Sequence, residues 1–167
     1  MRSPEKHTFA RFALISVVAF AVTLLIAVLL SEAKRSDEAD DPSRAMGGVE
    51  DVNSENYYDI VGHDQFVLLE FYAVWCGHCR KFSPIYEEFG KYIRIRPELQ
   101  GRVVVGKVNA PTEPRIRRRY RISGYPTVIL VPPNRHVGVE FTDNRNFNGL
   151  LDFVEREMAK KEYAIIE

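Results

Sequence analysis

Residues 71–81 of this chain are Phe71-Tyr72-Ala73-Val74-Trp75-Cys76-Gly77-His78-Cys79-Arg80-Lys81. This stretch holds the only two cysteines in the 167-residue sequence. Residues 66–72, which lead into it, form an apolar run with strand composition. Apolar side chains then recur at helical spacing, at Phe82, Ile85, Tyr86, Phe89 and Ile93. We therefore expect the two cysteines to lie where a strand ends and a helix begins.

That position predicts reactive sulfur chemistry. The first turn of a helix presents unpaired backbone N–H groups and the positive end of the helix dipole, which favour an anion there. Cys76 precedes the predicted helix, so its thiolate is stabilised relative to its thiol, and an N–H of His78 can stabilise it further. Cys79 lies three residues on, which is close enough for a disulfide without backbone movement. The sequence thus predicts a redox-active pair, with Cys76 as the nucleophile and Cys79 as the resolving cysteine.

The segment from Trp75 to Cys79, preceded by Glu-Phe-Tyr-Ala at residues 70–73, resembles the active site of the protein disulfide isomerase branch of the thioredoxin superfamily. The resemblance covers roughly residues 49–160. Three later features follow in the family's order: a helix proline at Pro84, a strand with a lysine at Lys107 and a Gly-Tyr-Pro-Thr loop at residues 124–127. It implies an α/β fold, a thioredoxin-like mixed sheet flanked by helices, and thiol–disulfide exchange.

The carboxyl group of Glu70 interrupts the apolar strand before the dithiol, and strand alternation places it under the sheet. Charged side chains are rarely buried without a partner or a task. The resemblance implies that Glu70 accepts the proton of Cys79 and pairs with Lys107. A salt bridge at the strand edge is the alternative. Gly77 and His78 are typical of the family's disulfide donors, since reductants of the thioredoxin type usually carry Gly-Pro there.

The resemblance also predicts a surface for substrate. It implies a cis peptide bond at Pro126 opposite the dithiol, which would expose the backbone of Tyr125 as an edge for an extended chain. Trp75 is expected to contact substrate beside it. Arg145 resembles the arginine whose approach favours the thiolate of the resolving cysteine. A solvated arginine is the alternative for this position, because the residue before it is Asn144 rather than glycine.

The ends of the chain predict its organisation. Residues 1–11 form a short basic segment, and residues 12–30 form an uncharged, mostly apolar run of 19 residues. As a helix this run spans about 30 Å, the hydrocarbon thickness of a bilayer. We expect a retained signal-anchor, although the small residues up to Ala33 would also suit cleavage there. Residues 31–48 have linker composition and residues 49–163 form the thioredoxin-like domain.

The expected element order within the domain is βαβαβαββα. Strands are predicted near residues 49–52, 66–72, 102–109, 126–131 and 137–141, and helices near 54–61, after the dithiol, at 112–120 and at 147–160. The formal net charge is zero, so no global field favours nucleic acid. We expect no cofactor and no metal, since a zinc site would lack a second cysteine pair. A dense basic cluster comprises Arg115, Arg117, Arg118, Arg119 and Arg121. It is either a solvated face or a contact for anionic lipid or an acidic partner.

Together these features predict a thiol–disulfide oxidoreductase that forms or rearranges disulfides in proteins of the secretory pathway. We expect it in the endoplasmic reticulum membrane, single-pass, with the catalytic domain in the lumen, or released after cleavage near Ala33. Residues 164–167 carry no Lys-Asp-Glu-Leu-type signal, so retention would depend on the anchor. A reductase of the thioredoxin type and a module that binds clients or a partner are the alternatives. Client, oxidant and oligomeric state are not predicted.

Overall fold

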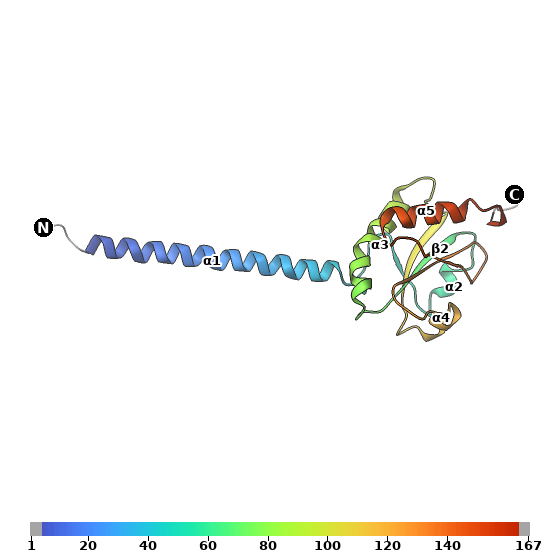
Figure 1. Cartoon of the computed structure of the whole chain (residues 1–167), viewed down its shortest axis with the longest axis horizontal. Coiled ribbons are helices and arrows are strands. Elements are labelled where there is room, and N and C mark those ends of the chain that lie inside the picture. Colours follow the sequence, from blue (N-terminus) through green and yellow to red (C-terminus); the bar gives the residue numbers. More distant parts are fainter. Residues whose placement is uncertain (1–4, 164–167) are drawn as a thin grey trace. The chain divides into compact units, whose positions relative to one another are not determined.

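The computed structural model describes residues 5–163, with side chains described for residues 15–34 and 40–163. Residues 1–4, part of the predicted basic segment, and the C-terminal residues 164–167 lie outside it. The chain divides into two units, Met1–Ala39 and Asp40–Glu167 (Figure 1). In the first unit, helix α1 (Glu5–Ala39) contains one span, Ile15–Lys34, that is long and apolar enough to cross a membrane. A signal sequence near the N-terminus would meet the same criterion.

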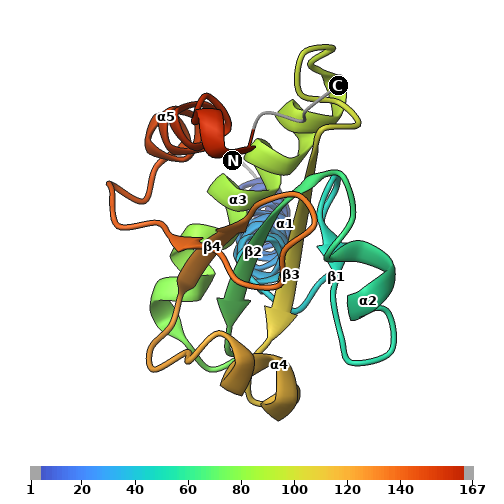
Figure 2. The same ribbon diagram turned by 90° about the vertical axis from the view of Figure 1, so that its right-hand side faces the viewer.

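The second unit is the predicted α/β domain. Its helices are α2 (Tyr57–Ile60), α3 (Gly77–Ile95), α4 (Pro114–Arg119) and α5 (Phe147–Met158), followed by a 3-10 turn at Lys161–Tyr163. Its strands are β1 (Glu50–Asp51), β2 (Phe66–Tyr72), β3 (Val103–Asn109), β4 (Thr127–Val131) and β5 (Val139–Glu140). Every predicted element of the domain is present, with ends shifted by a few residues. The sheet order is β1-β3-β2-β4-β5. Figure 2 labels the first four of these strands in this order.

Strand β2 lies at the centre of the sheet, and all seven of its side chains are buried. It pairs with β3 in parallel and with β4 antiparallel, so the sheet is mixed as predicted. Alternate residues of β2 feed two separate cores. Phe66 and Leu68 pack with α3 and α5, whereas Val67, Leu69 and Phe71 pack with residues of α2 and α4. Helices therefore cover both faces, as a strand buried on both sides requires.

The residues just before β1 form a strap, which we define as residues 41–48. We expected them to belong to a flexible linker of residues 31–48, and the structure differs. Residues 31–39 continue helix α1, and the strap packs on the domain with Met46 buried. The backbone N–H of Gly47 donates to Glu87 Oε1 at 3.0 Å, and Arg44 also pairs with Glu87. The sequence pattern missed this contact because one buried side chain and backbone donors leave no periodic signal.

The strap approaches α3 at a pair of glycines, which supplies a test of its docking. A Cβ added to Gly90 would lie 2.6 Å from Val49 Cγ2 and 2.8 Å from the carbonyl oxygen of Gly48. Alanine in a helix interior normally stabilises by about 1 kcal/mol relative to glycine. Here we expect Gly90→Ala to lower the unfolding free energy by about 1–3 kcal/mol, because it overpacks the contact.

Denaturant unfolding of the full chain in detergent measures this effect. Gly124→Ala is the matched control, because an added Cβ there meets no heavy atom within 4 Å. A Gly90→Ala variant as stable as the parent chain would show that the strap does not rest on α3.

Candidate active site

The two cysteines form a disulfide at the junction of β2 and α3. Their Cα atoms are 5.2 Å apart. Cys76 is the N-cap of α3, and its sulfur accepts a hydrogen bond from the backbone N–H of Cys79 at 3.1 Å. Cys79 is fully buried, whereas Cys76 retains 7% of its surface exposed to solvent. Cys76 is thus the sulfur that a thiol from outside can reach, and the helix end is placed to stabilise its thiolate.

The loop that leads into β4 lies beside the disulfide. The peptide bond from Tyr125 to Pro126 is cis. Tyr125 packs against the small cluster that contains both cysteines, and its ring lies edge-on to the ring of Trp75, with the centroids 5.9 Å apart. Trp75 is 75% exposed. An exposed aromatic ring next to an accessible sulfur offers an extended peptide both apolar contact and, at the loop, a backbone edge.

Glu70 lies within β2, two residues before the strand ends at Tyr72 and six residues before Cys76. It is fully buried, and neither carboxyl oxygen has a hydrogen-bond partner. Burial raises the pKa of Glu70 to about 8, although the positive charge of Lys107 opposes the shift. A carboxyl group with this pKa can hold or release a proton near neutral pH, as a proton carrier for a buried thiol must.

Lys107 stands beside Glu70 in the sheet register but bonds elsewhere. Its ammonium donates to the carbonyl oxygens of Pro42 (2.8 Å) and Arg44, and it pairs with Asp51 at 3.2 Å. The resemblance implied a direct pair between Lys107 and Glu70, and the structure instead gives a buried lysine held by the strap and β1. Its charge reaches Glu70 through space only. The sequence does not reveal that the strap carbonyls accept from Lys107, because backbone acceptors cannot be recognised from residue type.

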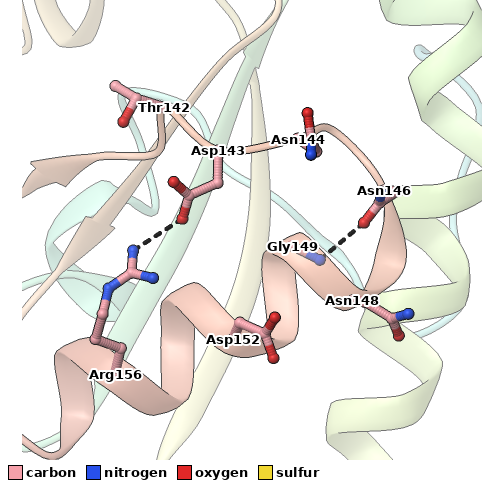
Figure 3. A pocket seen from close by; sticks show the side chains of 8 residues that line it. All are labelled: Thr142, Asp143, Asn144, Asn146, Asn148, Gly149, Asp152 and Arg156. Carbon is pink, nitrogen blue, oxygen red and sulfur yellow. Dashed lines mark hydrogen bonds and ion pairs between the residues drawn. The ribbon is translucent and has the colours of Figure 1, made fainter.

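Arg145 reaches the cis-proline loop rather than the cysteines. One of its terminal nitrogens donates to the carbonyl oxygen of Pro126 at 3.2 Å. The loop that carries it is fixed on both sides: Asp143 pairs with Arg156 at 2.9 Å, and the side chain of Asn146 caps α5 by accepting from Gly149 N–H at 2.8 Å (Figure 3). These contacts border an open polar hollow of about 610 Å³. The predicted effect of Arg145 on Cys79 stays a prediction.

The two residues between the cysteines are both on the surface. Gly77 and His78 are exposed, and a Cβ added at Gly77 would meet no other group within 4 Å. The structure therefore brings together Cys76, Cys79, Trp75, Tyr125 and Pro126. Glu70 and Lys107 are buried opposite each other on the neighbouring strands β2 and β3. Among the residues with described side chains, no group of three or more His, Cys, Asp or Glu side chains is placed to hold a metal ion.

Comparison with known proteins gives the family. The thioredoxin family model matches residues 48–156, which is more than half of the chain. The chain belongs to the thioredoxin family. Its relatives include a protein disulfide-isomerase of Schizosaccharomyces pombe, 35% identical over 99 residues, covering 59% of this chain and 26% of that protein. A protein disulfide-isomerase of Humicola insolens is 37% identical over 133 residues, covering 75% of this chain and 24% of that protein.

Solved structures show the same architecture. The first thioredoxin domain of mouse protein disulfide-isomerase A4 superposes with a TM-score of 0.61 at 28% identity, covering 72% of this chain and 82% of that domain. Human ERp44 superposes with a TM-score of 0.62 at 28% identity, covering 70% of this chain and 31% of that protein. The chain spans only 14–28% of the length of the curated relatives it matches. The likeness therefore concerns one domain of larger proteins.

Proposed function

We propose that this thioredoxin-family chain is a thiol–disulfide oxidoreductase that forms or rearranges disulfides in other proteins. The observation that carries the proposal is the disulfide at the start of α3, with Cys76 accessible and Cys79 buried beside the cis-proline loop. This arrangement exposes the sulfur of Cys76 to attack and keeps the sulfur of Cys79 buried. The similarity to protein disulfide-isomerases supports protein thiols and disulfides as substrates.

The exchange proceeds in two steps. A client thiolate attacks the sulfur of Cys76, the bond between Cys76 and Cys79 breaks, and Cys79 leaves as a thiolate that takes up a proton. A second client thiol then loses its proton, its sulfur attacks the first client sulfur, and Cys76 leaves as a thiolate. Counted from two thiols, the client has lost two electrons and two protons. The cysteine pair has gained the two electrons and, on Cys79, one proton, while the other proton goes to solvent because Cys76 remains a thiolate. Reversal of both steps reduces a client disulfide, and partial reversal rearranges it.

Glu70 is proposed to exchange the proton of Cys79 in these steps. Its carboxyl group is buried, unpaired and has a pKa of about 8, so it can give up its proton to the leaving thiolate and recover one later. Lys107, fixed by the strap, is proposed to keep that pKa from rising further through its charge. Tyr125 and Pro126 are proposed to align the client chain beside Cys76.

The reduction potential of the pair tests the direction of transfer. We expect a value near about −180 mV, typical of the isomerase, rather than the −270 mV or so of thioredoxin. The physical reason is stabilisation of the Cys76 thiolate by the helix end, which favours the reduced form. The full chain in detergent is equilibrated with glutathione buffers, and the oxidised fraction is measured by thiol alkylation and mass. A potential close to that of thioredoxin would overturn the donor role and leave a reductase.

We further propose that α1 tethers the domain to the membrane of the endoplasmic reticulum, with the domain in the lumen. The apolar span Ile15–Lys34 and the relatives support a place in the secretory pathway. The mass of the mature N-terminus separates the two fates of this helix. We expect a chain that retains residues 12–30, whereas a new terminus after Ala33 would show a cleaved signal and a released domain.

A further inference from the structure

Helix α4 and the turn after it carry a dense positive charge that the proposed chemistry does not use. All five arginines of residues 115–121 have exposed side chains. Among the residues whose side chains the structure describes, none of the five forms an ion pair. The neighbouring carboxylate, Glu113, is occupied by Ser54, whose backbone N–H donates to it at 2.9 Å. We call residues 115–121 the arginine surface. Its charge is left for a partner outside the domain.

Three of these guanidinium groups are already held in position. Arg119 lies over the rings of Tyr57 and Tyr58, 5.2 and 5.5 Å from their centroids, and donates to the hydroxyl of Tyr58 at 2.6 Å. Arg117 donates through Nε to the carbonyl oxygen of Ile122, and Arg118 in the same way to an oxygen of its own helix. Side chains that are positioned before binding lose less rotamer freedom when they meet a ligand.

The arginine surface borders a hollow that suits a peptide. Arg117, Arg118 and Arg121 line an open depression of about 620 Å³, together with Pro114 and Ile122. Guanidinium groups bind carboxylates through paired N–H donors, and the two apolar residues offer contact to the stem of an acidic side chain. The chemistry that fits this hollow is a chain segment that carries aspartate or glutamate.

The hollow lies at the end of the sheet that holds the dithiol. The ring of Tyr120 is 5.2 Å from that of Phe71, near the end of β2, and Ile122 shares a core with Tyr125 of the cis-proline loop. Figure 2 shows α4 at the end where β2 and β3 finish. The arginine surface and Cys76 thus lie at the same end of the sheet, so the residues that flank a client cysteine at Cys76 can extend toward the arginine surface. A flat bilayer against α4 would meet the same end of the sheet and compete with that client.

We propose that the arginine surface selects clients with acidic residues next to the reacting cysteine. The proposal rests on the proposed oxidoreductase function and names its substrate class. The arginine surface is a specificity determinant because it binds the acidic residues of the client. It is not catalytic, because it does not contact the reacting sulfurs. Electrostatic attraction of this kind raises the rate of productive encounter and weakens with salt.

The experiment compares two reduced peptides, each with one cysteine pair. In the acidic peptide four Asp or Glu residues flank the cysteines, and in the neutral peptide the matching Asn and Gln residues replace them. In a single turnover, the oxidised full chain in zwitterionic detergent is expected to oxidise the acidic peptide with a second-order rate constant about tenfold higher at low salt, and about twofold higher at high salt. R117Q/R118Q/R121Q is expected to bring the ratio near one. R117K/R118K/R121K, which keeps the charge, should retain most of the preference.

R94Q/R96Q/R102Q is the matched control, because it removes the same charge at the opposite end of α3 and should leave both rates unchanged. Failure to oxidise either peptide would refute the proposed function itself. Equal rates on the two peptides would refute only the selection of acidic clients. A third outcome would assign the arginine surface to lipid headgroups instead. In that case the two peptides are oxidised at equal rates, oxidation is slower in anionic than in zwitterionic vesicles, and R117Q/R118Q/R121Q abolishes this difference between vesicles.

Discussion

Replacing Cys76 by serine is expected to abolish oxidation of protein clients, a loss of about a thousandfold or more, because no other sulfur is accessible to start the exchange. Replacing Cys79 by serine leaves the nucleophile but removes the resolving thiol. That variant is expected to accumulate a mixed disulfide between Cys76 and the client. Both results are measured by non-reducing electrophoresis and mass analysis of the adduct after incubation with a reduced or an oxidised client.

The double variant Cys76→Ser/Cys79→Ser is the control for adducts that form elsewhere. Serine is close in size to cysteine, so the domain should keep its fold, and far-ultraviolet circular dichroism checks this. An adduct through Cys79 in the Cys76→Ser variant would contradict the assignment of roles. Survival of the cellular function in the double variant would favour the alternative, a module that binds clients through Trp75 and the cis-proline loop.

Glu70→Gln is expected to make the stability of the oxidised protein much less sensitive to pH. The pKa of Glu70 is raised to about 8 in the fold from an ordinary value of 4.5, so the folded state holds this proton more tightly than the unfolded chain. The stabilisation of the fold by the protonated Glu70 is therefore fully present below about pH 4.5 and is lost as the pH rises to about 8. The loss is about 4–5 kcal/mol in the unfolding free energy. Glutamine keeps the shape and cannot ionise.

Denaturant unfolding at pH 5 and pH 9, followed by the fluorescence of Trp75, measures the difference. Glu98→Gln is the matched control, since Glu98 is exposed and its substitution should leave the pH dependence of the parent chain intact. The same Glu70→Gln variant is expected to exchange disulfides about a hundredfold more slowly, because Cys79 loses its proton carrier. A Glu70→Gln chain with the pH dependence and the rate of the parent would show that Glu70 neither ionises in this range nor carries protons.

Much of the site follows from local pattern. The strand-to-helix junction at the cysteines, the apolar faces of α3 and α5 and the order of the elements along the chain all come from short-range periodicity, which one sequence displays. The motif at residues 75–79 and the proline at residue 126 implied the pairing of the dithiol with a cis-proline loop. The fold class is confirmed, and the reason is that each of these signals lies within a few residues of the element it predicts.

What the sequence determined by itself is the set of chemical groups at the site: two cysteines with a spacing of three, the start of a helix at the first of them and a carboxyl group in the strand before them. Only the tertiary structure decided the partners of the buried charges. It placed the strap over Lys107, turned Arg145 toward Pro126 and set the arginine surface at the dithiol end of the sheet. These contacts join residues far apart in the chain, many of them through backbone carbonyls that every residue possesses. No local pattern of side chains reveals these contacts, because they form only when segments distant in the sequence pack together.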